Sequence, residues 1–377
     1  MKIGILTYRQ APYISANTGI AYLLGEQLSK EHEVVFIGRK QDERQNAVRE
    51  FHGIPILWLN NEPTSSTGRA ENLLLRAGLI RAAFRADAGS LRSIVKENAL
   101  DALLCMTAPS EDALIAYAAR LSIPVILYQL DPYYNMNDTE TPWLKHQFLQ
   151  ILDAFKHVFT TELLMKEYLS DPSFSAKTGL FSVLPFPKLI PPPEAARSET
   201  GETGKIRLLY AGTLYRTVRS PAILKKLHAI LPDTCELRFC GGTDCEEDTV
   251  SLRDSGIVCL GYLDQTALAA EMAEADVLIN IGNAVKNQMG SKIIDYIATG
   301  KPILNITQLD SCPTLPLLCE YDYVYHMRAD EMLPSQELNT FVETAQGKRM
   351  AWETVEARWH EYTPAYAAAQ ILKQLER

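Results

Sequence analysis

The stretch Gly290–Pro302, read as GSKIIDYIATGKP, decides how the second half of the chain folds. Ser291 is the residue type that caps a helix, and Gly300 is the type that ends one, so a short helix is predicted between them. Pro302 then opens the apolar run KPILNI, which predicts a strand. Residues at helical spacing give this helix an apolar stripe with which it would pack on a sheet: Ile293, Ile294 and Ile297.

The amino end of the same helix is a candidate anion site. Its first backbone N–H groups have no partner within the helix, and the helix dipole also favours negative charge there, so phosphate is the usual guest. Gly290 and Ser291 leave room for it, and Lys292 adds a positive charge. Asp295 would accept hydrogen bonds from a ribose diol. An ordinary capped helix with a solvated Lys and Asp accounts for the same residues.

Length and composition describe an ordinary two-domain protein. At 377 residues the chain exceeds the size at which single cores stop growing, while 47% hydrophobic and 22% charged residues are typical of globular domains. No apolar run is long enough to cross a bilayer. The start, MKIGILTYR, lacks the features of a signal peptide, and the seven cysteines show no CxxC spacing. We therefore expect a cytoplasmic protein with reduced thiols.

The net charge of −9 is unevenly divided along the chain. Residues 1–190 contain 19 Lys and Arg against 20 Asp and Glu, or −1, which leaves 18 against 26, or −8, for residues 191–377. Nucleic acid selects basic faces, so a nucleic-acid partner is not expected.

Strands and helices alternate in both halves of the sequence. Residues 1–190 run from KIGILTY to FSVLPFP, and residues 205–357 begin again with IRLLYAGTLY, a strand that enters a glycine-containing loop. The segment 191–204 is rich in Pro, Gly, Ser and Glu and reads as a linker. We expect an α/β fold of two Rossmann-like doubly wound domains facing a central cleft, with a helix at 358–377 that crosses back onto the first domain.

Several motifs in this order resemble the GT-B glycosyltransferases, in particular the large retaining group often called family 4 or group 1. NTGIAYLLGEQLSKEHEVVFIG is similar to the opening glycine loop, helix and second strand of that family. YAGTLYRTVRSPAILKKL resembles its phosphate loop, FCGG its glycine loop, and IVCLGYLD its base-binding segment. SKIIDYIATGKPIL is similar to its SKxxEYxAxGKP motif. The resemblance covers nearly the whole chain.

This resemblance implies a set of donor-binding residues in the second domain. The family has two glutamates seven residues apart; counting back from Asp295, Asn287 takes the first position. An Arg and a Lys grip the donor diphosphate in the family; here Arg219 lies near the Lys position, Thr213 takes the place of the Arg, and Arg216 would compensate. The predicted donor-binding set is completed by backbone positions, Gly212, Gly241, Gly242, Gly290 and Ser291, together with Lys292. The alternatives are that Arg216 and Arg219 are solvated arginines at a helix start and that Gly241 and Gly242 form a plain turn.

The first domain would bind the acceptor. Many members of the family have a His after the strand that reads VILYQLD here, and this chain has none. Asp131 is the nearest candidate for substrate hydroxyls, so we expect Asp131 and Asn287 to act in catalysis. Gly19, Gln129 and Tyr133 are expected to contact the acceptor. Asp-Pro after a strand is also a common turn.

The expected activity is retaining, hexosyltransferase-type transfer from a nucleotide-diphosphate sugar to a glycan, glycolipid or lipid-linked acceptor in bacterial surface polysaccharide assembly. The departing diphosphate needs positive potential, which the arginines, Lys292 and the helix start would supply, so neither a metal nor another cofactor is expected. A non-catalytic nucleotide-sugar-binding or partner subunit on the same fold is the alternative. The missing GxGxxG after the first strand argues against a nicotinamide oxidoreductase.

The stretch Gly68–Glu97 is predicted to be helical, with arginines on one face and apolar side chains on another. Arg81, Arg85 and Arg92 share the first face, and Ile80, Phe84 and Leu91 the second. A solvated face accounts for this pattern, and so does contact with an anionic membrane surface.

Overall fold

The structure is a computed structural model that describes residues 1–7, 10–11, 15–59, 69–107, 111–136, 138–193 and 204–376, without the side chains of residues 69–71 and 107. Most of the expected linker, residues 194–203, and Gly68 lie outside this range. The chain divides into two units. Unit 1 comprises Met1–Lys188 and Glu361–Arg377, and unit 2 comprises Leu189–His360. From the sequence, the first domain is expected to end at residue 190 and the helix that returns to it to begin at residue 358.

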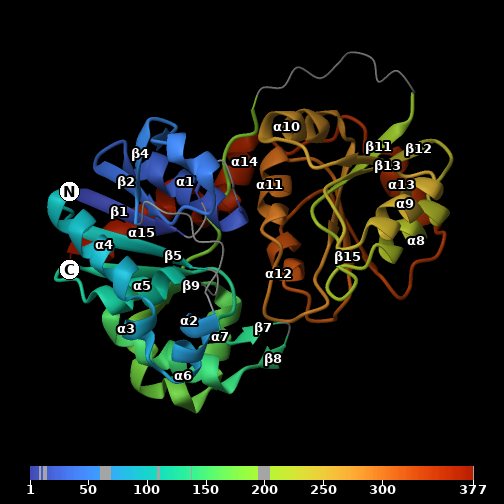
Figure 1. The fold of residues 1–377 in the computed structure, drawn as a ribbon. Coiled ribbons are helices and arrows are strands. Elements are labelled where there is room, and N and C mark those ends of the chain that lie inside the picture. The colour runs from blue at the N-terminus through green and yellow to red at the C-terminus, as the bar shows by residue number, and fades with distance from the viewer. Residues whose placement is uncertain are drawn as a thin grey trace. The chain divides into compact units, whose positions relative to one another are not determined.

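In the described residues of unit 1, eight strands form one sheet in the order β10-β9-β6-β5-β1-β2-β4-β3 (Figure 1). Neighbouring strands are parallel except β3 and β4. The chain order reverses between β1 and β5, which makes a topological switch point there. The strands are β1 (Lys2–Thr7), β2 (Glu33–Gly38), β3 (Glu50–Phe51), β4 (Ile54–Trp58), β5 (Ala102–Thr107), β6 (Val125–Gln129), β9 (His157–Thr160) and β10 (Phe181–Val183).

The helices of unit 1 cover this sheet, and a short hairpin follows β6. The helices are α1 (Ala16–Leu28), α2 (Arg69–Arg76), α3 (Ile80–Ala83), α4 (Arg85–Glu97), α5 (Glu111–Ala119), α6 (Pro142–Ile151), α7 (Glu162–Ser170) and α15 (Pro364–Glu376). The hairpin pairs β7 (Asn135–Met136) with β8 (Thr139–Glu140), and 3-10 turns occur at Glu43–Ala47, Leu152–Ala154, Pro172–Leu180 and His360–Tyr362. α15 packs on α1, and Lys156 Nζ donates a hydrogen bond to the carbonyl of Leu375.

The stretch Gly68–Glu97 is not one helix. Gly78 adopts a left-handed φ of 74° after α2, and the chain restarts at α3 and again at α4. The expected apolar face is nevertheless confirmed, since Ile80, Phe84 and Leu91 are at most 1% exposed. The arginines of the other face therefore lie on different helices.

Six parallel strands form the sheet in the described part of unit 2, in the order β13-β12-β11-β14-β15-β16 (Figure 1). In chain order this is 3-2-1-4-5-6, the arrangement of dinucleotide-binding sheets, with its switch point between β11 and β14. The strands are β11 (Ile206–Ala211), β12 (Cys235–Cys240), β13 (Val258–Gly261), β14 (Val277–Ile281), β15 (Ile303–Thr307) and β16 (Val324–Arg328). The expectation of two Rossmann-like domains is confirmed.

The helices between these strands pack on the sheet through apolar stripes. They are α8 (Ala222–Ile230), α9 (Glu246–Asp254), α10 (Gln265–Glu274), α11 (Lys292–Thr299), α12 (Thr314–Leu318), α13 (Gln336–Glu343) and α14 (Trp352–Arg358). The predicted stripe of α11 is confirmed, because Ile293, Ile294 and Ile297 are at most 1% exposed. Gly300 ends the helix at a φ of 71°. No helix of the described residues is long and apolar enough to cross a membrane.

A row of polar side chains crosses three neighbouring strands of unit 2. Asn305 Oδ1 accepts hydrogen bonds from Asn280 Nδ2 at 2.7 Å and from the Thr314 hydroxyl at 3.0 Å. Its Nδ2 must therefore donate, and it lies 3.0 Å from His326 Nδ1. The row requires His326 Nδ1 to be an unprotonated acceptor.

Candidate functional site

The carboxyl edge of the unit 2 sheet is tightly packed around glycines. Gly212 N donates to the carbonyl of Cys240, and Gly241 N donates to the carbonyl of Gly261, so the loops after β11, β12 and β13 lie against one another. Gly241 has a φ of 142°, and a Cβ built there would lie 2.1 Å from the carbonyl oxygen of Gly212. Only glycine fits at this position. The predicted Gly212 and Gly241 thus shape the edge at the switch point.

A buried tyrosine fixes α11 to this edge. The Tyr296 hydroxyl accepts a hydrogen bond from Ala211 N at 2.9 Å and donates to the Ala211 carbonyl at 3.1 Å. Burial raises the pKa of Tyr296, so the hydroxyl stays protonated. The middle of α11 is therefore held next to the end of β11. Sequence reasoning assigned no role to Tyr296, although a tyrosine inside an apolar stripe is a signal of a buried hydroxyl that needs a partner.

The amino end of α11 differs in part from the prediction. Ser291 precedes the helix, but its own backbone is helical, with φ −65° and ψ −14°, and its side chain forms no capping hydrogen bond. A capping side chain requires an extended backbone, so the predicted cap at Ser291 is wrong. Lys292 Nζ lies 3.1 Å from Asp295 Oδ2. The charge of Lys292 is therefore partly offset by the carboxylate expected to bind ribose.

Arg219 is the best-placed cation of this edge. Positions for a Cβ on Gly212 and on Gly290 lie 3.7 and 3.6 Å from the same guanidinium nitrogen of Arg219, so its guanidinium is beside both glycines. The guanidinium also lowers the pKa of Tyr210, opposing the larger upward effect of burial. Among the described residues, no carboxylate lies within ion-pairing distance of Arg219, and its buried Nε has no hydrogen-bond partner.

The loop that carries Arg219 is held by backbone contacts. Arg219 N donates to the Tyr215 carbonyl at 2.8 Å, and the Val218 carbonyl accepts from Gln308 Nε2 at 2.8 Å and from Ala284 N at 2.9 Å. These bonds join the loop to the ends of β14 and β15. The backbone at Arg219 is therefore fixed to the ends of these two strands.

Arg216 forms an ion pair with a carboxylate of α9. Its Nε lies 2.7 Å from Asp248 Oδ2, and a second nitrogen lies 3.1 Å from Asp248 Oδ1. This fork to a carboxylate on α9 satisfies the guanidinium, and the ion pair is exposed. The predicted role of Arg216 as a diphosphate ligand stays a prediction, and it requires the guanidinium to leave Asp248.

Asn287 lies in the loop between β14 and α11 and is 8% exposed. Its neighbour in the same loop, Asn283, is 7% exposed and donates through Nδ2 to the Gln288 carbonyl at 3.1 Å, while its Oδ1 has no partner. A buried amide oxygen without a partner is rare and marks a candidate ligand contact. The sequence analysis assigned no role to Asn283.

An exposed aromatic ring covers the glycine loop. A Cβ built on Gly242 would lie 2.6 Å from the Tyr262 hydroxyl and 2.7 Å from its ring, so the ring rests on Gly242. Tyr262 is nevertheless 77% exposed. The segment containing Tyr262 was predicted to bind a base, but this side chain was not singled out. Its open ring face is suited to stacking.

In unit 1 the structure brings Asp131 to the start of α1. Asp131 Oδ2 accepts a hydrogen bond from Asn17 Nδ2 at 3.0 Å. Burial raises the pKa of Asp131, and the bond from Asn17 lowers it by less. Gln129 is fully buried and donates through Nε2 to the Asp131 carbonyl at 3.1 Å. Gln129 therefore positions Asp131 through its Nε2, while its buried Oε1 has no hydrogen-bond partner among the described residues. Its expected contact with an acceptor stays a prediction.

The remaining predicted residues of unit 1 have different surroundings. Gly19 lies in the first turn of α1, where its N–H donates a hydrogen bond to the Ser15 carbonyl, and its predicted acceptor contact stays a prediction. Tyr133 is 2% exposed, stacks on Phe148 and donates a hydrogen bond to Gln147 Oε1 at 2.7 Å. These contacts place Tyr133 in the aromatic core of unit 1, and its predicted acceptor contact stays a prediction. An aromatic residue next to a turn gives no sequence signal that separates the two roles.

A buried ion cluster follows β2. Arg39 has a side chain 6% exposed, pairs with Glu111 at the start of α5, and lies 3.6 Å from Asp87 of α4. Removing one partner of such a cluster leaves an uncompensated buried charge. The cluster therefore joins the strand edge to two helices, and sequence reasoning missed it because the three residues are far apart in the chain.

Within the described ranges, no group of three or more His, Cys, Asp and Glu is placed to hold a metal ion. All seven cysteines are free.

The fold of both units and the glycine-lined edge of unit 2 define the GT-B class of glycosyltransferase structures. The sequence itself matches neither a protein-family model nor any curated protein.

Solved structures of this class align over the whole chain. Sucrose-phosphate synthase from Thermosynechococcus elongatus has a TM-score of 0.70 and 14% identity, covering 99% of this chain and 97% of the other. HepE from Anabaena, solved with UDP and glucose, has a TM-score of 0.65 and 14% identity over 100% and 99%. The lipopolysaccharide outer core galactosyltransferase WaaB has a TM-score of 0.62 and 12% identity over 100% and 99%.

Proposed function

We propose that this protein is a retaining glycosyltransferase of the hexosyltransferase type. It would move a sugar from a nucleotide-diphosphate sugar to a glycan, glycolipid or lipid-linked acceptor in bacterial surface polysaccharide assembly. The observation that carries the proposal is the guanidinium of Arg219, which lies beside Gly212 and Gly290 and has no carboxylate partner among the described residues. The fold similarity to HepE, solved with UDP and glucose, supports a nucleotide-sugar donor.

In the proposed reaction the donor diphosphate lies at the carboxyl edge of unit 2. Negative charge grows on the diphosphate as the bond to the sugar breaks, and a fixed cation stabilises that charge most when it needs no rearrangement. Arg219 and the amino end of α11 supply this potential, so the chemistry is proposed to be independent of metal. The unpartnered Oδ1 of Asn283 and the open ring of Tyr262 would contact the donor.

Unit 1 supplies the acceptor side of the proposal. Asp131 is held by Asn17 and Gln129, and its raised pKa makes it a better proton acceptor than an ordinary aspartate. We assign it a hydrogen bond to a reacting sugar hydroxyl. The cytoplasm is the proposed compartment, in keeping with seven free cysteines.

The test is a thermal-shift screen of nucleoside diphosphates, followed by incubation with nucleotide sugars. A ligand at a hundredfold excess over its Kd stabilises the folded state by about 2.7 kcal/mol. Arg219→Gln should abolish most of this stabilisation by UDP. Arg216→Gln is the matched control, because it removes the same charge from the same loop but its guanidinium is already bonded to Asp248. Equal losses in both variants would refute the assignment of Arg219.

A second candidate is a nucleotide-sugar-binding subunit without transferase activity. Asn287 favours it, because an amide stands where the similar family has a charged glutamate. The two candidates differ in turnover. Release of nucleoside diphosphate from a nucleotide sugar, abolished by Asp295→Ala, would exclude the binding subunit; tight donor binding without release or transfer across an acceptor panel would exclude the enzyme.

A further inference from the structure

The helices α2, α3 and α4 of unit 1 form a basic surface on an acidic protein. Residues 69–92 contain five arginines and two acidic residues, a net +3, whereas the whole chain has a net charge of −9. One of the two acids, Asp87, is 4% exposed and lies beside the buried Arg39. It does not neutralise the surface. We call the exposed arginines Arg76, Arg81 and Arg85, with the exposed leucines Leu73 and Leu79, the basic patch.

The arginines of the basic patch have no carboxylate partners among the described residues. No ion pair forms at Arg76, Arg81 or Arg85 within the described part of the chain, although exposed arginines elsewhere do pair, as Arg216 does with Asp248. The Arg81 guanidinium is instead held over the Tyr117 ring, 4.9 Å from its centre, and Gln150 Nε2 donates to the Tyr117 hydroxyl at 3.3 Å. Arg81 is thus ordered while its charge remains available.

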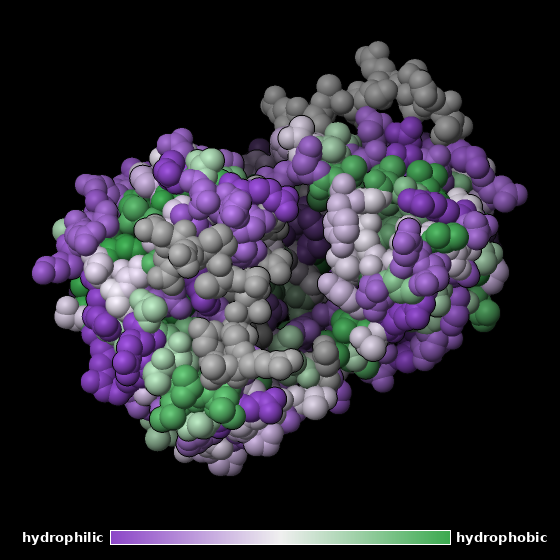
Figure 2. Space-filling view, viewed as in Figure 1, coloured by the Kyte–Doolittle hydropathy of each residue, from purple (hydrophilic) through white to green (hydrophobic). Residues whose placement is uncertain are grey.

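Two of the most exposed apolar side chains of the protein lie in the same patch. Leu73 on α2 is 70% exposed, and Leu79, between α2 and α3, is 53% exposed. Hydrophobic side chains gather on the surface where Figure 1 labels α2 and α6 (Figure 2). A combination of exposed leucines and cations is typical of a segment that lies at a membrane interface. Binding to nucleic acid would not bury the exposed leucines.

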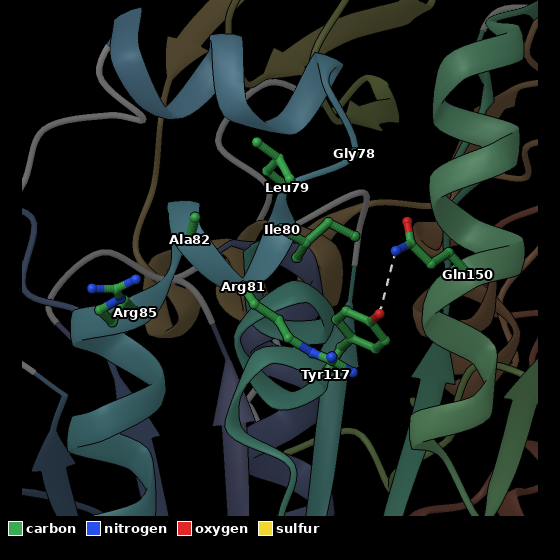
Figure 3. A pocket seen from close by; sticks show the side chains of 8 residues that line it. All are labelled: Gly78, Leu79, Ile80, Arg81, Ala82, Arg85, Tyr117 and Gln150. Carbon is green, nitrogen blue, oxygen red and sulfur yellow. Dashed lines mark hydrogen bonds between the residues drawn. The ribbon is translucent and has the colours of Figure 1, made fainter.

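The geometry of the arginines favours a surface over a single anion. Arg81 and Arg85 line a hollow of about 470 Å³ with Leu79 and Tyr117. Arg81 extends towards Tyr117, whereas Arg85 points away from it (Figure 3). The two guanidinium groups therefore do not converge on one phosphate. They match negative charges that are spread over an area, as in a layer of anionic lipid headgroups.

We propose that the basic patch docks the protein on an anionic phospholipid surface, with Arg81 and Arg85 at the headgroups and Leu73 and Leu79 at the acyl boundary. This inference goes beyond sugar transfer and does not depend on it. It places the acceptor-side unit at the membrane by contacts that lie outside the proposed site.

Co-sedimentation with vesicles tests the proposal. Vesicles of phosphatidylcholine alone are compared with vesicles that also contain phosphatidylglycerol, at low and high salt. We expect binding to the anionic vesicles that weakens with salt. Because each arginine near an anionic surface changes partitioning about fivefold, Arg81→Gln with Arg85→Gln should reduce partitioning about 25-fold. Leu73→Ser with Leu79→Ser should reduce it independently of salt.

A matched control removes the same charge from another part of unit 1. Arg44→Gln with Lys166→Gln changes two exposed cations outside the patch and should leave partitioning unchanged. Equal binding to both vesicle types, or equal losses in the two charge variants, would overturn the proposal. Displacement by soluble glycerol phosphate at constant ionic strength would also overturn it in favour of a small phosphate site. UDP stabilisation, measured on the same variants, reports separately on the proposed function.

Discussion

Gly241→Ala should damage the donor edge through the backbone alone. The new Cβ would lie 2.1 Å from the oxygen and 2.8 Å from the carbon of the Gly212 carbonyl, and backbone atoms cannot turn aside as a side chain can. Overpacking costs about 1–3 kcal/mol. An alanine held at this φ of 142° adds backbone strain of about 1–3 kcal/mol. We expect the free energy of unfolding of unit 2 to fall by about 2–6 kcal/mol.

Gly347→Ala is the control, because Gly347 has a φ of 74° and open space around its Cβ position. It carries only the left-handed penalty, about 1–2 kcal/mol. Hydrogen exchange followed by mass spectrometry reads each unit separately, with peptides of unit 1 as the internal reference. Faster exchange in β11 and β12 and loss of UDP stabilisation are expected for Gly241→Ala. Exchange rates equal to those of Gly347→Ala would refute the close-packing argument.

Three further predictions concern pH and ligand binding. Burial lowers the pKa of His326, so below pH 6.5 the unfolded chain binds a proton that the folded chain does not bind, and unit 2 should lose stability as the pH falls. His326→Asn keeps an acceptor for Asn305 and should remove this dependence of the free energy of unfolding on pH, measured by urea titrations. An unchanged pH dependence would contradict the assignment to His326. Burial raises the pKa of Asp131, so the wild type loses stability as the pH rises above 3.8. Asp131→Asn should therefore be more stable than the wild type at neutral pH, but its rate of sugar transfer should be lower. A variant that is less stable at neutral pH would show that the carboxylate is needed for folding. Tyr262→Ala should weaken UDP binding by about 1–3 kcal/mol, the value of one stacked base, with no change in Tm because the ring is 77% exposed; calorimetric titration with UDP that shows unchanged affinity would exclude stacking.

The backbone of this protein could be predicted from sequence because its signals are local. The apolar run after Pro302 and the left-handed Gly300 lie within a few residues of the elements they define. The alternation of such segments then gives two doubly wound sheets. The failure at Gly68–Glu97 is also local, since Gly78 interrupts a pattern whose apolar spacing continues on both sides.

The side-chain partners of the site could not be predicted in the same way. Tyr296 binds Ala211 across 85 residues, and Arg216 binds Asp248 across 32. Nothing in the neighbouring sequence indicates such partners, because they depend on which strands become adjacent. Arg219 and Arg216 look alike in sequence, yet only one of them meets a carboxylate.

The return of the chain to unit 1 has a consequence for biosynthesis. α15 buries Ala367 and Ile371 completely and rests on α1, so unit 1 lacks this cover until α15 has been synthesised. Unit 2 ends at His360, so all its segments are synthesised before those of unit 1 are complete. The α1 surface emerges from the ribosome hundreds of residues before its partner helix. A chain that stops just after unit 2 would leave this surface of α1 uncovered permanently.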